Sequence, residues 1–165
     1  YSDALITKMK DIALGVVTAD CVPIILYDIK NQIIGCVHAG WKGAKSGIIE
    51  NTIKKFKKLN SKNKIFASVG PCIGQKSYEV DINFYKRFVS KSKKNSVYFV
   101  KKNNNKKLFN LRKYVNDKLI KLNVKVDHVK HDTFREKNRF FSYRRSQKLK
   151  EKDYGRCISV ISLFS

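Results

Sequence analysis

Short apolar stretches recur along the chain between polar segments, a pattern that predicts strands. A run or alternation of apolar residues over about four to eight positions is typical of a strand buried on one or both faces. Pro23 is expected at the start of its strand, because proline has no amide hydrogen to donate to a strand ladder. The expected strands cover residues 3–7, 12–18, 23–27, 33–37, 65–69, 97–100, 124–128 and 157–164.

Three longer segments place their apolar residues on one side of a helix. In the first, residues 44–59, the apolar row stands opposite a run of lysines, which we interpret as a solvated face. The second covers 77–88, and the third covers 111–122. The lysine- and asparagine-rich segment 101–107 is expected to be a turn loop or disordered. Strands in hairpins, separated by helices, predict an α+β domain.

Two of these strands, on either side of the polar stretch 28–32, are predicted to form a hairpin that organises the rest of the chain. Asn31 tolerates the left-handed conformation that a tight turn needs. A loop of two or of four residues gives the same register, in which Pro23 faces His38. Cys21 then lies diagonal to His38, with Cα atoms about 7–8 Å apart.

Cys21 and His38 are the candidate metal ligands of this hairpin. A thiolate and an imidazole are ligands that zinc prefers, and a catalytic zinc typically keeps three protein ligands and one open position. The hairpin supplies two, so spacing alone also fits a buried thiol beside a hydrogen-bonded loop histidine. Asp20 is expected to accept backbone hydrogen bonds, or alternatively to orient a metal-bound histidine. His128 and His131 point to opposite faces of a strand and are interpreted as non-ligands.

The chain has a formal net charge of +23, and lysine supplies 29 of its 36 basic residues. Such a charge can attract nucleic acid, but the lysines are scattered, and a codon bias toward A and T explains much of the excess. The sequence contains neither an RNA-recognition aromatic motif nor a zinc-finger spacing. We therefore predict no specific nucleic-acid partner, and a positive field that draws phosphate and nucleotides toward a cleft.

Length and cysteine use predict a single domain in a reducing compartment. The chain can bury a sizeable core, and its four cysteines are spread out rather than clustered as in a disulfide scaffold. It has no apolar run near the roughly 18 residues of a membrane span, so we predict no membrane association and a cytoplasmic location. The chain opens on Tyr1 and enters a strand at once, so the domain 1–165 is expected to lack its N-terminal portion.

Five short sequences occur in order along the chain: Thr18-Ala19-Asp20-Cys21-Val22-Pro23, His38-Ala39-Gly40-Trp41-Lys42-Gly43, Gly70-Pro71-Cys72-Ile73-Gly74, Tyr78-Glu79-Val80 and Phe140-Phe141-Ser142-Tyr143-Arg144-Arg145. Together they resemble the YfiH-like laccase-domain family. This family was once called multicopper polyphenol oxidases and is now regarded as zinc-dependent purine nucleoside phosphorylases. The resemblance extends from Asp3 to Arg156, which is nearly the whole chain.

The resemblance implies a four-layer α/β/β/α arrangement with mixed sheets, the YfiH-like fold. It also implies a zinc enzyme that acts on purine nucleosides such as adenosine, inosine and guanosine, with phosphorolysis and adenosine deamination both reported for the family. The ion would lie between Cys21, His38 and a histidine that the family carries in a Gln-Val-His sequence upstream of residue 1. The older laccase name predicts copper instead, although several coppers would need many more histidines.

Five further residues are candidates for binding the nucleoside or phosphate. Lys42, Arg144 and Arg145 could hold phosphate against the ribose, although the arginines could equally be salt-bridged. Lys42 stands where the family usually has arginine, which would replace a bidentate contact by a point charge. Trp41 suits a stacked base and a core position equally. Cys72 has no nearby base that the sequence can name, so we interpret it as a structural or pocket-lining thiol rather than a nucleophile.

Three alternatives to a zinc phosphorylase stay open on the sequence. The chain could be a truncated, non-catalytic domain that keeps the fold and has lost the chemistry. It could be a copper-dependent polyphenol oxidase, as the laccase name says. A basic nucleic-acid-binding module is the third, and it would show a steep salt dependence of binding.

Overall fold

The computed structural model describes residues 2–59 and 64–165, and five of the strands in these ranges form one sheet. They are β1 (Ala4–Thr7), β3 (Val22–Asp28), β4 (Ile33–Ala39), β5 (Phe66–Val69) and β9 (Lys125–His128). Their order in the sheet is β1-β4-β3-β5-β9. β5 and β9 run parallel and the other neighbours run antiparallel, so the sheet is mixed, as predicted. β3 and β4 are almost continuously buried, which fits a sheet covered on both faces.

The predicted hairpin is present, and its register is the predicted one. β3 pairs with β4 so that Pro23 lies opposite His38. The positive φ in the connecting loop falls on Gln32, at 49°, and not on Asn31 as expected. Asn31 instead uses its side chain, which donates a hydrogen bond to the Asp28 carboxylate at 2.8 Å. This hydrogen bond lies within the loop, and Gln32, directly before β4, is the residue that adopts the left-handed conformation.

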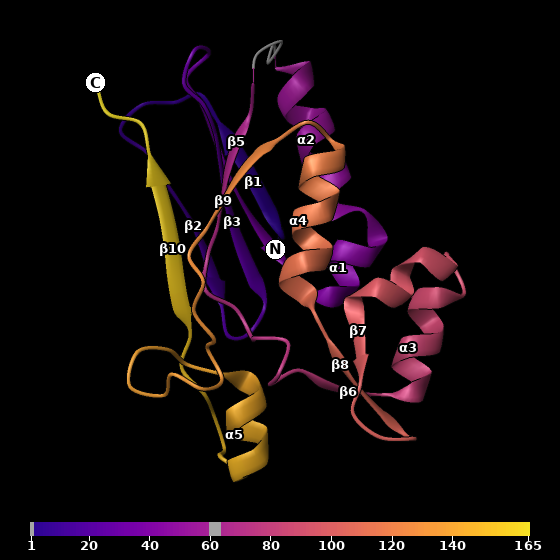
Figure 1. The fold of residues 1–165 in the computed structure, drawn as a ribbon. Helices are drawn as coiled ribbons and strands as arrows, with labels where there is room; N and C mark the ends of the chain where they lie inside the picture. Colours follow the sequence, from indigo (N-terminus) through magenta and orange to yellow (C-terminus); the bar gives the residue numbers. More distant parts are fainter. Residues whose placement is uncertain (1, 60–63) are drawn as a thin grey trace.

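Helices cover one face of the sheet (Figure 1). They are α1 (Trp41–Ser46), α2 (Ile48–Lys58) and α4 (Leu111–Lys121). The helix expected over 44–59 is in fact two helices, because Gly47 adopts a left-handed φ of 98° between them. The apolar row of α2 is buried as predicted, and its members are Ile49, Thr52, Ile53 and Phe56.

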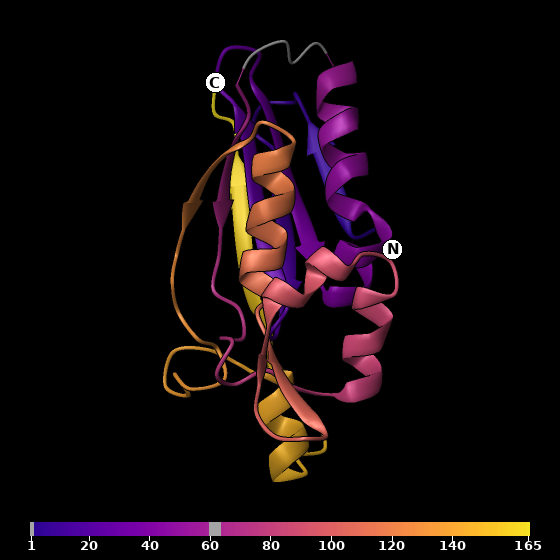
Figure 2. The same cartoon turned by 45° about the vertical axis from the view of Figure 1, so that its right-hand side comes forward.

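A two-stranded antiparallel sheet packs against the opposite face of the large sheet (Figures 1 and 2). It consists of β2 (Ala13–Thr18) and β10 (Cys157–Ser162). An apolar cluster fills the space between the two sheets, and its buried members are Leu14, Val16, Ile34 and Cys36. The class is therefore α+β, and the described residues supply helices, sheet and sheet in the predicted layer order. Within the described ranges, the outer face of the β2–β10 sheet is not covered by a helix.

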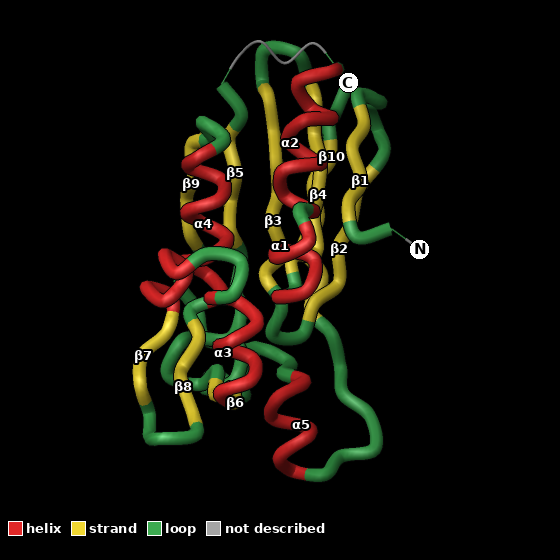
Figure 3. Tube along the Cα trace, turned by 90° about the vertical axis from the view of Figure 1, so that its right-hand side faces the viewer, coloured by secondary structure: helices red, strands yellow, loops and turns green. Residues whose placement is uncertain are grey.

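A third, small sheet lies at one end of the helical layer (Figure 3). Its strands, in order, are β6 (Glu79–Asp81), β8 (Lys106–Phe109) and β7 (Phe99–Lys101), accompanied by α3 (Ile82–Val89) and a 3₁₀ helix (Lys93–Tyr98). The helix expected over 77–88 therefore begins later. Asp81 caps it, because its carboxylate accepts a hydrogen bond from the Phe84 N–H at 2.6 Å. The segment 101–107 is a hairpin turn between two strands and not a disordered loop.

Phe88 lies at the centre of the aromatic core under α3, and it is fully buried. Its ring centroid is 4.9 Å from that of Phe109 and 5.0 Å from that of Phe84. We expect Phe88→Ala to lower the free energy of unfolding by about 3–5 kcal/mol, because it removes a large side chain and leaves a cavity. Urea denaturation measures this change. Val97→Ala, at an exposed position, is the control, and an equal effect of the two variants would contradict the packing assigned to Phe88.

The remaining helix, α5 (Tyr143–Leu149), lies between β9 and β10 in the sequence and projects at the end of the molecule where β3 begins (Figure 1). The Ser142 side chain caps it by accepting a hydrogen bond from the Arg145 N–H at 3.1 Å. None of the helices in the described ranges has the length and apolar character that a membrane crossing requires.

Candidate functional site

Cys21 and His38 lie at neighbouring ends of β3 and β4. Cys21 directly precedes β3, and His38 pairs with Pro23, the second residue of that strand. The side chains of Cys21 and His38 both point toward Gly40. A Cβ atom placed on Gly40 would lie 3.0 Å from the Cys21 Sγ and 3.9 Å from the His38 Nε2. The two donor atoms therefore face the same small space, which is open because Gly40 has no side chain.

The imidazole of His38 has one engaged nitrogen and one free nitrogen. Its Nδ1 lies 3.4 Å from the carboxylate of Asp3, and its backbone N–H donates to the Asp3 carbonyl at 2.8 Å. Its Nε2 is buried and has no hydrogen-bond partner among the described residues. A metal-binding histidine usually has a carboxylate or carbonyl on the nitrogen that does not bind the ion. Asp3 thus occupies the orienting position that the sequence suggested for Asp20.

Asp20 is buried and joins this corner to the C-terminal part of the chain. Its carboxylate accepts hydrogen bonds from the hydroxyl of Thr133 at 2.7 Å and the hydroxyl of Ser142 at 2.9 Å. A backbone N–H, that of Arg144, is the third donor at 2.6 Å. These bonds satisfy a buried carboxylate that would otherwise be costly. They also place the start of α5 beside Cys21.

A cavity of about 250 Å³ opens on one side of Cys21, and we call it the aromatic cavity. Large aromatic side chains form much of its wall, while the guanidinium of Arg144 brings a positive charge. Flat apolar walls with a few polar groups suit a planar ligand with polar edges. The lining residues are Ala19, Asp20, Cys21, Trp41, Ile73, Tyr78, Leu111, Tyr143 and Arg144.

A second cavity, of about 350 Å³, is also lined by Cys21, and we call it the histidine cavity. It contains both candidate metal ligands and the side chain of Arg156. Three residues, Ala19, Cys21 and Tyr143, line both cavities, so the two spaces meet at the thiol. The full lining consists of Val17, Thr18, Ala19, Cys21, His38, Tyr143, Tyr154 and Arg156.

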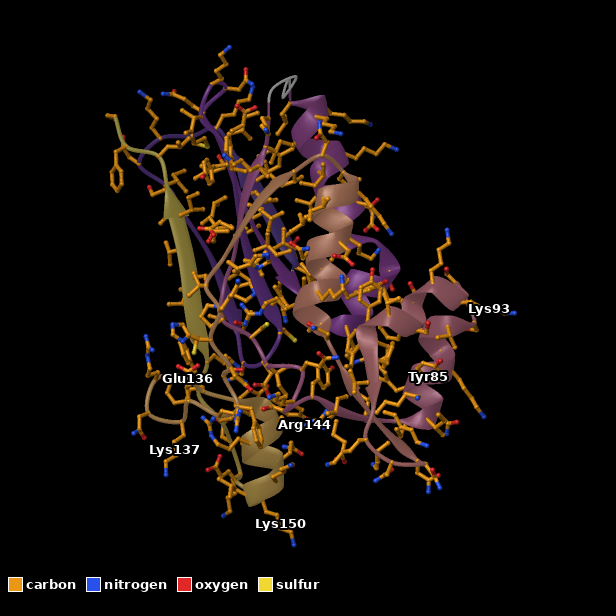
Figure 4. All side chains as sticks on the ribbon, in the orientation of Figure 1. Tyr85, Lys93, Glu136, Lys137, Arg144 and Lys150 are labelled. Carbon is orange, nitrogen blue, oxygen red and sulfur yellow. The ribbon has the colours of Figure 1, made fainter. Side chains whose placement is uncertain are left out.

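Arg144 is the predicted phosphate-binding residue that the structure does bring to Cys21, as a wall of the aromatic cavity. Its side chain lies between α5 and the small sheet (Figure 4) and bridges them, because Nη1 donates to the Glu79 carbonyl at 2.7 Å. The guanidinium also lies 5.3 Å from the centre of the Tyr78 ring, within the range of a cation–π contact. Arg144 is thus held in place and keeps donor capacity toward the cavity.

Arg145 and Lys42 take other positions than those predicted. The Arg145 guanidinium donates to the carbonyls of Thr133, Phe134 and Phe140 at 2.6 to 2.9 Å. Because these carbonyls occupy its donors, Arg145 fixes the loop before α5 and does not line either cavity. Lys42 is exposed at the start of α1, and its Nζ lies 5.7 Å from the centre of the neighbouring tryptophan ring. It does not line either cavity.

Trp41 and Cys72 differ in how they relate to the site. Trp41 is half-buried, lines the aromatic cavity and packs on Phe84 with ring centroids 4.8 Å apart. It therefore serves both roles considered for it, a core contact and a cavity wall. Cys72 is fully buried, and burial is the main cause that raises the pKa of its thiol to about 12. A thiol that resists ionisation in this way supports a structural role for Cys72.

The remaining cysteines and histidines lie away from the pair. Cys36 is buried between the two sheets, and Cys157 opens β10. The Nε2 of His128 lies 2.9 Å from the Asn116 side-chain oxygen, and the Nδ1 of His131 lies 2.9 Å from a Glu136 carboxylate oxygen. The ring nitrogens named here are therefore engaged.

Burial also raises the pKa of the Cys21 thiol, to about 11, and the charges of Asp20 and Asp3 add to this in smaller measure. A cation beside the sulfur acts in the opposite direction, because it stabilises the thiolate. The pair fits one zinc ion by the chemistry of its donors, by the unpartnered Nε2 and by the open space over Gly40. In the part of the chain that the structure describes, three or more histidine, cysteine or acidic side chains do not gather to hold a metal. Cys21 and His38 would therefore supply two ligands, one fewer than a catalytic zinc typically keeps.

Several residues of the site were not identified as site residues from the sequence. Asp3, Tyr78, Tyr143, Tyr154 and Arg156 reach it through contacts between distant segments. Arg156, for example, lies at the site because the next residue, Cys157, begins β10 and pairs with Thr18 at the end of β2. The available indication was the family resemblance, which includes a tyrosine in two of its motifs and ends at Arg156.

The α+β fold, with its mixed sheet, helical layer and second small sheet, is that of a YfiH-like protein. The chain belongs to the family described as multi-copper polyphenol oxidoreductase laccase, whose family model matches residues 1–164.

Curated relatives cover nearly all of this chain. A protein of Rickettsia conorii named purine nucleoside phosphorylase is 39% identical over 162 residues, which are 97% of this chain and 67% of the relative. A Haemophilus influenzae protein of the same name is 33% identical over 163 residues, 97% of this chain and 64% of that protein. The chain thus spans about two thirds of the length of these relatives.

Solved structures show the same fold. The Bacillus licheniformis protein YfiH superposes with a TM-score of 0.88 at 27% identity, over 98% of this chain and 61% of that one. The Neisseria meningitidis protein NMB0706 superposes with a TM-score of 0.86 at 28% identity, over 99% of this chain and 65% of that one.

Proposed function

We propose that this protein is a zinc-dependent purine nucleoside phosphorylase whose substrates meet at Cys21. The observation that carries the proposal is that the Cys21 Sγ and the unpartnered His38 Nε2 face one small space where two cavities meet. The names of the relatives from Rickettsia conorii and Haemophilus influenzae support the choice of substrate class. The family resemblance supports zinc and supplies the expected third ligand, a histidine upstream of residue 1.

A phosphorylase must bind a purine nucleoside and a phosphate together, and the two cavities offer surfaces suited to both. A purine is flat and carries polar edges, which suits the walls that Trp41 and Tyr78 contribute to the aromatic cavity. Phosphate requires fixed positive charge, which Arg144 and Arg156 bring to the two cavities. When bound, zinc supplies a Lewis acid at the junction. Holding both substrates in reach of one another is itself a large part of catalysis.

In phosphorolysis an oxygen of hydrogen phosphate forms a bond to the ribose C1′ while the bond from C1′ to the purine nitrogen breaks. The electron pair of the broken bond leaves with the base, and the proton of hydrogen phosphate ends on that base. The products are ribose 1-phosphate and the free purine. Positive charge develops on the sugar in the transition state, so a phosphate dianion held close to C1′ stabilises it. The same site would support the second family activity, in which water replaces the amino group of adenosine and ammonia leaves.

The test is chromatography of adenosine or inosine after incubation with the zinc-loaded full-length protein, with and without phosphate. We expect free base and ribose 1-phosphate only when phosphate is present, and inosine from adenosine in either case if deamination also occurs. An unchanged nucleoside pool would defeat the enzyme proposal and favour a non-catalytic domain. Metal analysis that finds copper, together with oxidation of a phenol, would favour the laccase alternative.

The proposed third ligand makes a separate prediction about metal content. We expect the full-length protein to bind about one zinc ion and the 165-residue chain to bind zinc much more weakly, because two protein ligands hold the ion loosely. The 165-residue chain should accordingly be at best weakly active. Equal zinc content and turnover in the two proteins would show that Cys21 and His38 suffice, and that the upstream histidine is not a ligand.

A further inference from the structure

We propose that Arg156 holds the phosphate co-substrate in the histidine cavity while the aromatic cavity binds the nucleoside. This inference rests on the proposed function and assigns each substrate to its own cavity. The sequence offered Lys42, Arg144 and Arg145 for phosphate. The structure offers a different cation, in the cavity that also contains His38.

The guanidinium of Arg156 is positioned and yet has free donors. It stacks on the ring of Tyr154, with 4.5 Å from its central carbon to the ring centroid, and Nη1 donates to the Tyr154 carbonyl at 3.2 Å. Tyr154 is in turn fixed by edge contact with Tyr143, with ring centroids 5.0 Å apart. The other N–H groups of Arg156 have no partner among the described residues. Because the planar guanidinium is already held in position, it loses little conformational freedom when it binds two oxygens of one phosphate.

The other cations near the site are less suited to this role. Arg145 gives its donors to three loop carbonyls, and Lys42 lies outside both cavities. Arg144 lines the aromatic cavity, but one of its donors is committed to the Glu79 carbonyl. Arg156 is therefore the cation that shares a cavity with both candidate metal ligands.

The carboxylates near the site favour the same assignment. Asp20 lines the aromatic cavity, where its negative charge would oppose an anion in spite of the three hydrogen bonds it accepts. Among residues 2–59 and 64–165, no acidic residue lines the histidine cavity. Asp3 stands behind His38, 3.4 Å from its Nδ1, and does not line the cavity. Of the two cavities, the histidine cavity is thus the better electrostatic environment for phosphate.

The arrangement of the cavities also suits the displacement at C1′. An incoming oxygen and a departing base must approach and leave on opposite sides of that carbon. The two cavities have different linings but share Ala19, Cys21 and Tyr143, so ligands in both would meet there. A purine held in the aromatic cavity and a phosphate held by Arg156 would then approach the ribose from different cavities, as the bond exchange needs.

The experiment compares Arg156→Ala, Arg156→Lys and Arg144→Ala in the zinc-loaded full-length protein. Two readouts are used: the KM values for phosphate and for inosine, and the Kd for inorganic phosphate by calorimetry without nucleoside. We expect Arg156→Ala to raise the phosphate KM and Kd about 10- to 100-fold, with the inosine KM and zinc content within about twofold of wild type. The phosphate KM and Kd of Arg156→Lys should lie between those of wild type and Arg156→Ala, because a point charge replaces the planar guanidinium. Arg144→Ala should raise the inosine KM and leave the phosphate Kd nearly unchanged.

Arg139→Ala is the matched control. Arg139 is also exposed and also stacks on an aromatic ring, that of Phe140 at 5.6 Å, but it lies outside both cavities. It should leave both readouts unchanged. A wild-type phosphate Kd in Arg156→Ala, or a larger phosphate effect in Arg144→Ala, would overturn the assignment. If the wild-type protein shows no phosphorolysis, the proposed function fails, while calorimetry with inorganic phosphate still decides the role of Arg156.

Discussion

Replacing Cys21 by alanine is expected to remove both zinc and turnover from the full-length protein. The thiolate is one of the two ligands proposed for this chain, and the loss of groups that merely support a ligand already costs about 10- to 100-fold in metal affinity. We therefore expect zinc content below about one tenth of wild type after dialysis, and no detectable release of free base. Metal analysis by mass spectrometry and the chromatographic assay measure the two effects on the same sample.

Cys157→Ala is the control for this experiment, because that thiol is also partly exposed but opens β10 and is not part of the predicted pair. It should retain zinc and activity. Turnover that survives in Cys21→Ala, or that persists in wild-type protein after a chelator has removed the metal, would contradict a metal-dependent reaction at this site. Retained zinc with lost turnover would instead give Cys21 a role in the chemistry and not in holding the ion.

Gly40→Ala is expected to weaken metal binding strongly without disturbing the fold. The added Cβ would lie 3.0 Å from the Cys21 Sγ and 3.9 Å from the His38 Nε2, so it would fill the space that both donors face. Alanine is compatible with the backbone here, since Gly40 has φ −70° and ψ 165°. We expect zinc affinity to fall by at least about 10-fold and the melting temperature to change little. Competition with a zinc-binding dye measures the affinity.

Gly43→Ala is the matched control, because a Cβ there would make only ordinary contacts of 3.6 Å and more. Gly43 lies inside α1, where alanine is the better helix former, so this variant should be at least as stable as wild type. It should bind zinc normally. Equal zinc affinity in the two variants would show that the ion, if bound, does not lie over Gly40.

The hairpin and the nearness of Cys21 to His38 could be predicted because they depend on local rules. Side chains alternate along a strand, and both plausible loop lengths give one register, so Pro23 had to face His38. The helix at α4 followed in the same way from its apolar spacing. Of the small sheet only β7 was predicted, as a strand over 97–100 that in the structure covers Phe99–Lys101. β6 and β8 were missed, since strands of three or four residues show too little periodicity and find their partners only in the folded chain.

The cavity residues were harder to predict for a related reason. Charge and motif suggested that both arginines of Phe140–Arg145 reach the cleft, but the rotation of α5 decides which of them does. That rotation depends on Asp20 and on the loop carbonyls that hold Arg145. Arg156 and Asp3 mark the ends of the family resemblance, but no spacing or periodicity in the sequence brings them to the site. Their roles come from strand pairing at the edges of the two sheets.

The three hydrogen bonds of Asp20 also bear on the order in which the site forms during folding. They join residues 113, 122 and 124 positions apart, whereas Cys21 and His38 belong to one hairpin. Contacts between distant segments form more slowly than local ones, because a long loop must close first. We therefore expect the metal pair to assemble early and both cavities to close only when the C-terminal segment docks. A nascent chain on the ribosome would then be able to take up zinc before it can bind a nucleoside.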